Sequence, residues 1–262
     1  NNTIQKDYFL PSLNLKYNLN DKNSFRLGAS KTYTLPQAKE ISPYRYVGVN
    51  FNSQGNPNLK PSDNYNLDLK WDFNPTPTEL ISLTAFYKLI KNPISRIEVA
   101  SAGGYLSYEN IADKATVAGV EIEIRKNLFV RPVSNAAHGM NKLSLGLNGS
   151  YIYTNAKMPL ATVTTGSQLE GAAPWIVNFD LSHNFTKGER SFVNTLVLNY
   201  VSDKIYTIGT QGYQDIMEQG VLTLDFVSQA KLNKHLSLNL KARNLLNPSY
   251  KLSRKANENG EK

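Results

Sequence analysis

Residues 65–73 read YNLDLKWDF, in which large apolar side chains alternate without a break with polar or charged ones. Successive side chains of a β-strand point to opposite faces, so this stretch predicts a strand with one apolar and one wet face. The same alternation recurs along the chain, most clearly at residues 13–19, 83–89, 120–125, 175–181 and 236–242. It predicts about ten strands, most of them ten or more residues long.

Strand length and composition narrow the class of protein. Globular strands usually have ~5–6 residues, whereas a tilted strand that spans a membrane needs ~9–11. No apolar run approaches the ~20 residues of a transmembrane helix, so a membrane-spanning form of this chain must be a barrel. The chain has 15 tyrosines and 10 phenylalanines. It has no cysteine, and this absence excludes a disulfide framework and a thiolate metal site.

The connections between the predicted strands alternate between short and long. The short ones are residues 21–24, 75–79, 187–190 and 233–235, and residues 130–141 are intermediate. The long ones are residues 35–62, 91–114, 157–173 and 202–218. Outer-membrane barrels have short periplasmic turns and long extracellular loops. The sequence therefore predicts an all-β, antiparallel up-and-down transmembrane β-barrel, with residues 1–262 in one domain or part of one.

The formal charge of +8 is spread along the chain, and its densest basic run, residues 251–255, is mixed with polar residues. We interpret these charges as solvated lumen, turn and loop positions rather than a nucleic-acid surface, and expect no nucleic-acid partner. Residues 1–10 are polar and do not form a signal peptide, so the true N-terminus is expected to lie elsewhere.

Four stretches carry a family resemblance. They are GNPNLKPSDNYNLDL (residues 55–69), LISLTAFYKLIKNP (80–93), NIADKATVAGVEIEIR (110–125) and NLLNPSY (244–250). In this order they resemble the barrel of TonB-dependent receptors, particularly those of Bacteroidetes-type bacteria, and matches extend over about residues 9–250. Each motif is moderately specific, and their order makes the signal strong.

The resemblance implies an outer-membrane location in a Gram-negative bacterium, contact with outer-membrane lipid, and energy-dependent uptake of a small-molecule, glycan or peptide ligand. Siderophores, haem and cobalamin are among the ligand classes. Family members also carry an N-terminal plug and a segment that contacts the TonB complex, neither of which this chain contains. Family barrels have about 22 strands. We therefore expect residues 1–262 to be the C-terminal portion of a larger barrel without its final strand, with residues 259–262 in the last extracellular loop.

Glycine and proline positions within these motifs predict structural roles. Gly55, Pro57 and Pro61 predict a turn from an extracellular loop back to the rim. Gly119 predicts a bulge or a close approach within a strand. Pro248 is expected to end a strand.

Catalytic chemistry has no sequence signature here. His138, His183 and His235 lie far apart in the sequence, and no pair has metal-ligand spacing. Glu121 and Glu123 share one strand face and are expected to face the lumen with Arg125. No nucleophile motif, phosphate-binding loop or dinucleotide fingerprint occurs. We expect no enzyme activity, no cofactor and no metal site.

Ligand contact is expected from the long loops, where aromatic side chains can stack on rings and arginine can pair with anions. The candidates are Tyr44, Arg45, Tyr46, Phe51, Tyr105, Tyr108, Tyr206 and Tyr213. Packing between loops, or anchoring at the membrane interface, explains the same residues equally well.

Two other functions remain open at this point. A passive porin-like channel would conduct ions, whereas a plugged receptor stays closed. A soluble β-sandwich binding module would need a second sheet to cover apolar rows such as Leu236, Leu238 and Leu240.

Overall fold

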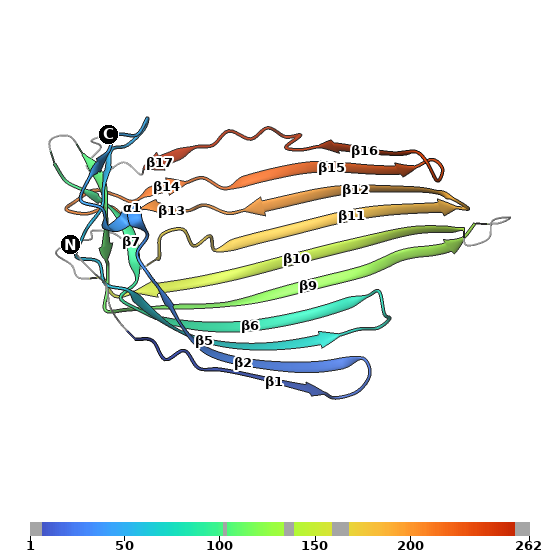
Figure 1. Cartoon of the computed structure of the whole chain (residues 1–262), viewed down its shortest axis with the longest axis horizontal. Coiled ribbons are helices and arrows are strands. Elements are labelled where there is room, and N and C mark those ends of the chain that lie inside the picture. The colour runs from blue at the N-terminus through green and yellow to red at the C-terminus, as the bar shows by residue number, and fades with distance from the viewer. Residues whose placement is uncertain (1–6, 102–103, 134–138, 159–167, 255–262) are drawn as a thin grey trace.

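The computed structural model describes residues 7–101, 104–133, 139–158 and 168–254. It contains one long curved sheet with a smaller layered region at one end (Figure 1). None of the helices within the described residues is long and apolar enough to cross a membrane.

The long sheet, which we call the wall, has ten antiparallel strands. They are β1 (Ser12–Asn18), β2 (Asn23–Thr34), β5 (Ser62–Phe73), β6 (Leu80–Lys91), β9 (Lys114–Pro132), β10 (Met140–Ala156), β11 (Trp175–Lys187), β12 (Arg190–Val201), β15 (Val221–Lys231) and β16 (Ser237–Ala242). Each strand pairs with the next one in this order, so the predicted up-and-down arrangement is confirmed. The wall curves but does not close, because β1 and β16 are its two ends.

The connections at the two ends of the wall differ as the sequence predicts. At one end only residues 188–189 join β11 to β12, and residues 74–79 join β5 to β6. Gly188 has a φ of +59°, which suits glycine in so short a turn. At the other end the links are residues 35–61, 92–113, 157–174 and 202–220. Figure 1 shows all the long links on the left and the short ones on the right.

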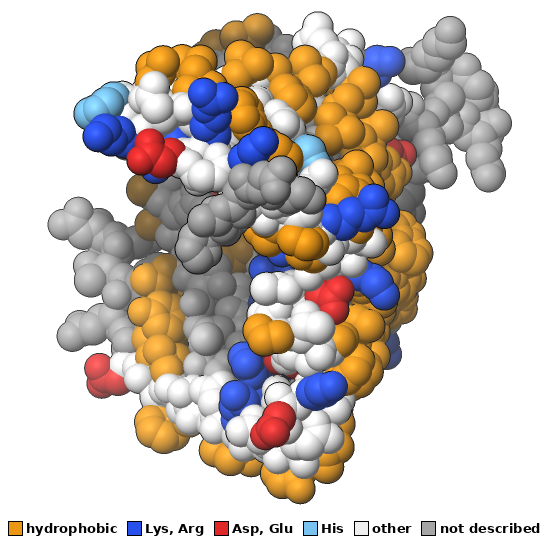
Figure 2. Space-filling model, turned by 90° about the vertical axis from the view of Figure 1, so that its right-hand side faces the viewer, with side chains coloured by type: hydrophobic (Ala, Val, Ile, Leu, Met, Phe, Trp, Pro, Cys, Tyr) orange, Lys and Arg blue, Asp and Glu red, His pale blue; other side chains and the backbone are white. Residues whose placement is uncertain are grey.

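Each wall strand has one exposed apolar face. The register places Leu15, Leu27, Leu69 and Ala85 side by side on this face. Leu15 and Leu69 are 54% and 53% exposed, whereas Ser82 on the opposite face of β6 is 2% exposed. Hydrophobic side chains follow the convex outer edge of the wall, which curves around a hollow (Figure 2). This is the arrangement of a barrel wall whose outside meets lipid.

The soluble β-sandwich alternative is wrong. The predicted apolar row is exposed, with Leu236 just before β16 at 46% and Leu238 and Leu240 on β16 at 55% and 59%. Within the described residues no second sheet covers the outer face of the wall.

The long links fold into a region that we call the cap. One sheet has the order β3 (Arg45–Tyr46), β4 (Ser53–Gln54), β8 (Tyr105–Asn110) and β7 (Ile94–Val99). A second has the order β13 (Lys204–Thr207), β14 (Ile216–Glu218) and β17 (Leu252–Arg254), and α1 (Ala38–Ile41) is a single turn. These segments were expected to be loops, and their strands were not predicted from the sequence.

A conventional hydrophobic core lies under the cap, where its sheets meet the ends of the wall strands. Its buried members are Ile97, Ile111, Ala112, Ala115, Ala156, Leu169, Ile205 and Ile208. Ile208 is 0% exposed and forms a parallel bridge with Ile97. The cap therefore joins links that are far apart in the sequence into one packed unit.

The predicted backbone roles have mixed outcomes. A Cβ at Gly55 would lie 2.6 Å from the carbonyl oxygen of Lys39, so this position requires a close approach to α1. Gly119 also marks a close approach, since a Cβ there would meet the Phe86 ring. The only register shift between β9 and β10 lies instead at Leu143. The expectation for Pro248 is wrong, because β16 ends six residues earlier at Ala242.

Candidate ligand-binding site

The cap brings several of the predicted ligand residues together. The Arg45 guanidinium lies 5.7 Å from the centre of the Tyr105 ring. The rings of Phe51 and Tyr206 lie 6.2 Å apart, centre to centre. These contacts join residues 35–61 to both of the links at 92–113 and 202–220. The sequence placed these residues in separate loops, and the fold brings them into contact in two pairs.

Arg96 is the centre of this assembly. Its guanidinium lies 3.9 Å from the centre of the Tyr206 ring, and its Nε and Nη2 donate to the Tyr206 carbonyl oxygen at 3.1 and 2.7 Å. Nη2 also donates to Glu170 Oε1 at 3.0 Å, and the Arg96 backbone N–H donates to Glu170 Oε2 at 2.9 Å. Arg96 therefore connects β7 to the links at residues 157–174 and 202–220.

Sequence reasoning missed both Arg96 and Glu170. Arg96 stands in an alternation where Ser95 and Ile97 are buried, at 3% and 5% exposure. That alternation could have revealed β7, with Arg96 and Glu98 on its open face. Glu170 carries no local signal, because only the packing of distant links brings it to Arg96.

Partial burial shapes the electrostatics of this centre. Removal from water raises the pKa of the Glu170 carboxyl, although the hydrogen bonds and charge of Arg96 oppose the rise. Burial also raises the pKa of the Tyr108 hydroxyl, again against the charge of Arg96. A guanidinium held in such a partly dry setting interacts more strongly with an incoming anion than one in bulk water.

A pocket of about 370 Å³ lies on the Glu98 side of β7. It is lined by Phe51, Glu98, Ile216, Leu252, Ser253 and Arg254. Arg254 pairs with Glu98 and lies 5.4 Å from the centre of the Tyr213 ring, which brings Tyr213 to the edge of this pocket. Apolar walls with a few charged groups suit a small organic ligand. The neighbouring rings and guanidinium groups could hold an aromatic ligand that carries negative charge.

The remaining candidates are spread over the cap. Tyr44 is 75% exposed, and Tyr46, which is 40% exposed, has the Lys39 ammonium 5.5 Å from its ring centre. Tyr108 is half-buried, and its backbone oxygen accepts a hydrogen bond from Asn56. Loop packing therefore accounts for part of the predicted set, while Phe51, Tyr206 and Tyr213 border the pocket region.

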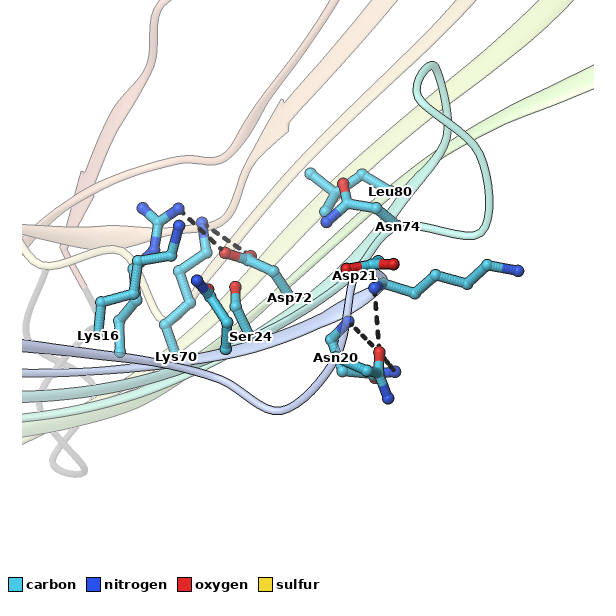
Figure 3. A pocket seen from close by; sticks show the side chains of 12 residues that line it. Lys16, Asn20, Asp21, Ser24, Lys70, Asp72, Asn74 and Leu80 are labelled. Atoms are coloured by element: carbon cyan, nitrogen blue, oxygen red, sulfur yellow. Dashed lines mark hydrogen bonds and ion pairs between the residues drawn. The ribbon is translucent and has the colours of Figure 1, made fainter.

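A larger and more polar cavity, of about 590 Å³, lies at the opposite end of the wall near the short turns (Figure 3). Asp72 is at its centre and pairs with Arg26 and Lys70 at 3.6 and 3.5 Å. Lys16 and Asp21 also line it. These charges sit on the lumen face, where a wet interior is expected.

Metal-binding side chains do not gather into a site in the part of the chain that the structure describes. No group of three metal-binding side chains occurs there. His183 lies 2.8 Å from the Asn141 side-chain oxygen, and His138 lies outside the described residues. Glu123 pairs with Arg125 at 2.7 Å, in keeping with the expected charged lumen row.

A family model described as "TonB dependent receptor-like, beta-barrel" matches residues 1–245. This chain belongs to that family. It is therefore a segment of a Gram-negative outer-membrane β-barrel, and the known members to which it is similar are receptors rather than enzymes. The "Iron-regulated outer membrane virulence protein" of Vibrio cholerae is 25% identical over 228 residues, which cover 83% of this chain and 32% of that protein.

Solved receptors share the fold of this TonB-dependent receptor segment. A mutant ferric enterobactin receptor of Pseudomonas aeruginosa in complex with enterobactin has a TM-score of 0.58 and 19% identity, over 90% of this chain and 35% of that one. The siderophore receptor PirA of Acinetobacter baumannii has a TM-score of 0.58 and 18% identity, over 90% and 36%. The chain thus spans about a third of the length of these relatives.

Proposed function

We propose that residues 1–262 are the C-terminal portion of the barrel of an outer-membrane receptor that takes up a ferric siderophore by TonB-dependent transport. The observation that carries the proposal is the cap, a packed unit on the long-loop rim of a barrel wall from this family. The open sheet and the length of the relatives support a larger barrel. The chain is proposed to bind and pass its ligand without catalysing a reaction.

The siderophore class is favoured by two independent features. The Vibrio cholerae relative is named for iron regulation, and the structural neighbours include receptors for ferric enterobactin. The surface formed by Phe51, Arg96, Tyr206 and Arg254 offers rings for stacking and guanidinium groups for an anion. A ferric complex of an aromatic siderophore presents both chemistries to the cap.

Binding by the intact receptor tests the ligand class, with ferric enterobactin as the first probe. We expect Phe51→Ala to weaken binding about tenfold, close to the loss of one stacking contact. Tyr87→Ala is the matched control, because Tyr87 is an aromatic residue that is 45% exposed on the outer face of the wall. Haem, cobalamin and glycans are titrated alongside. Saturable binding of one of these, with no ferric enterobactin binding, would overturn the siderophore assignment.

Transport tests the partner. Uptake of radiolabelled ferric enterobactin by cells that produce the receptor should stop when TonB is inactivated, while binding to the cell surface continues. Uptake that persists without TonB, together with steady conductance of the pure protein in a planar bilayer, would favour the passive porin-like channel instead.

A further inference from the structure

A row of lysines lies on the outer face of the wall, at the rim that carries the long links. The register aligns Tyr33, Asp63, Lys91 and Lys114 across β2, β5, β6 and β9. The next row toward the middle of the wall holds Lys31, Tyr65 and Leu89. These positions share the strand face of the exposed apolar residues Leu67 and Tyr87, so the lysines point outward, away from the lumen.

Two of these lysines, Lys31 and Lys91, lie near the ring of Tyr65. Lys31 Nζ and Lys91 Nζ lie 5.5 and 5.4 Å from the centre of the Tyr65 ring. Lys31 pairs with Asp63 at 3.6 Å. Lys91 and Lys114 are exposed and form no ion pair with any described residue. We call Lys31, Tyr65, Lys91 and Lys114 the lysine patch, and Lys31 is the one of its three cations that forms an ion pair with a described residue.

The lysine patch is local to these four strands. At the same end of β10, β11 and β12 the outward positions hold Tyr153, Trp175 and Tyr200, which are 52%, 52% and 40% exposed. Aromatic side chains at this level mark the boundary between hydrocarbon and headgroups. The patch therefore adds positive charge to one sector of an aromatic belt.

The apolar residues around the patch favour a lipid over a free anion as its partner. Leu89 lies beside Tyr65 in the same row, and the next row toward the middle of the wall holds Leu67 and Tyr87, in the apolar band that acyl chains cover. Long lysine side chains can lay their methylene groups along such a band and present the ammonium at the headgroup level. A headgroup whose acyl chains already cover the band is held beside the lysines, whereas a free anion must be captured from water.

We propose that the lysine patch binds the phosphate of a lipid headgroup in the outer leaflet of the membrane. Ammonium groups attract phosphate strongly, and clustered lysines next to a membrane recognise anionic lipids. The patch is assigned to the outer leaflet because the chain belongs to a family of outer-membrane barrels and because the long links mark the extracellular rim. This assignment does not depend on which ligand the receptor takes up or on whether transport is active.

Native mass spectrometry of the intact receptor in a neutral detergent tests this proposal, with bisphosphorylated lipid A as the probe. We expect Lys91→Gln/Lys114→Gln to weaken lipid binding by roughly 30-fold, and the addition of Lys31→Gln to bring the loss to the order of a hundredfold, at about fivefold per lysine. Lys88→Gln is the matched control, because Lys88 lies on the same strand as Lys91 but faces the lumen. The double variant keeps the Lys31–Asp63 pair, so it separates lipid contact from any loss of folding.

Each result decides the question. Weaker binding in the patch variants with an unchanged control, and weaker binding of dephosphorylated lipid A to the wild type, would support the proposal. Equal binding by wild type and patch variants, an equal loss in Lys88→Gln, or equal affinity for the dephosphorylated lipid would overturn it. Displacement of the lipid by millimolar inorganic phosphate would also overturn it, in favour of a site for free phosphate.

Discussion

Large apolar side chains are exposed in the wall and buried in the cap. Leu69 and Leu238 are 53% and 55% exposed on the wall, whereas Leu106 and Ile208 in the cap are 4% and 0% exposed. A barrel wall is surrounded by hydrocarbon, so its apolar groups gain nothing by turning inward. The cap extends beyond the membrane and must enclose its apolar groups as a water-soluble domain does. One chain thus follows opposite burial rules on either side of its rim.

Polar contacts divide in the same way. On the inner face of the wall, polar side chains form ladders between neighbouring strands, such as Asn178 with Asn148 and Ser182 with Thr195. In the cap, the Arg96–Glu170 pair connects residues that lie in different links. Wall contacts therefore support pairing that the backbone already makes, whereas cap contacts determine which links meet.

Truncation of a buried cap residue should have the largest effect. Ile208→Ala is expected to destabilise the cap by about 2–5 kcal/mol, because it removes buried methyl groups and leaves a cavity. Hydrogen exchange at the Glu98 amide, which donates to the Ile208 carbonyl at 2.9 Å, measures this loss. The wall counterpart Leu67→Ala should cost about 1–2 kcal/mol in a bilayer, since lipid fills the space. Equal losses of stability in Ile208→Ala and Leu67→Ala would contradict the proposed difference in burial between the cap and the wall.

A charge on the lipid face should have the next largest effect. Leu69→Arg places a guanidinium near the middle of β5 on the outer face and is expected to cost about 2–4 kcal/mol. The neighbouring Asp68→Arg faces the lumen and should cost less than about 1 kcal/mol. Denaturant unfolding from lipid vesicles compares the two variants. A larger loss for Asp68→Arg would show that the assigned faces are reversed.

A glycine in the wall tests how tightly its inner face is packed. Gly119→Ala should cost about 1–3 kcal/mol, because the new Cβ would meet the Phe86 ring and the backbone of Tyr151. Gly149→Ala is the control, since its Cβ would find Ile122 Cγ2 at 3.6 Å, an ordinary contact distance. The same unfolding measurement applies. Similar losses of stability in the two variants would show that the Phe86 ring moves aside for the added methyl group.

The acidity of Glu170 should produce the smallest effect, confined to the cap. Its folded pKa is raised, so the folded cap binds this proton more readily than the unfolded chain does. Cap stability should therefore fall as pH rises from the ordinary glutamate range through the raised pKa, and remain level above it. Exchange at the Gly171 amide, corrected for its intrinsic rate, should show this fall in the wild type. Glu170→Gln should remove it, and an unchanged profile in the variant would assign it to another group.

The wall could be predicted from the sequence and the cap could not. Stretches such as residues 65–73 repeat one alternation long enough to identify a strand, and the face of each strand follows from the same alternation. β3 and β4 have two residues each, too few for any period to appear. The partners of these short strands also depend on segments from other links, which no local pattern reports.

The candidate site divides along the same boundary. Phe51 and Tyr206 were predicted from residue type and loop position, but not that their rings would be 6.2 Å apart. Arg96 was missed because it is a single basic residue in a link that was expected to be a loop, and Glu170 because its partner lies 74 positions away in sequence. The ligand role of all these residues remains a prediction, which the Phe51→Ala comparison tests.

The contact between Arg96 and Tyr206 spans 110 positions of the chain, and four wall strands, β9 to β12, lie between the two residues. The wall is built from hairpins between neighbours in sequence, whose loop closure costs little entropy. Contacts of long sequence separation form slowly by comparison. The cap should therefore close only after the intervening hairpins have inserted and paired. Its closure then serves as a late checkpoint of assembly, at which a receptor with a misregistered wall would remain open to surface proteases.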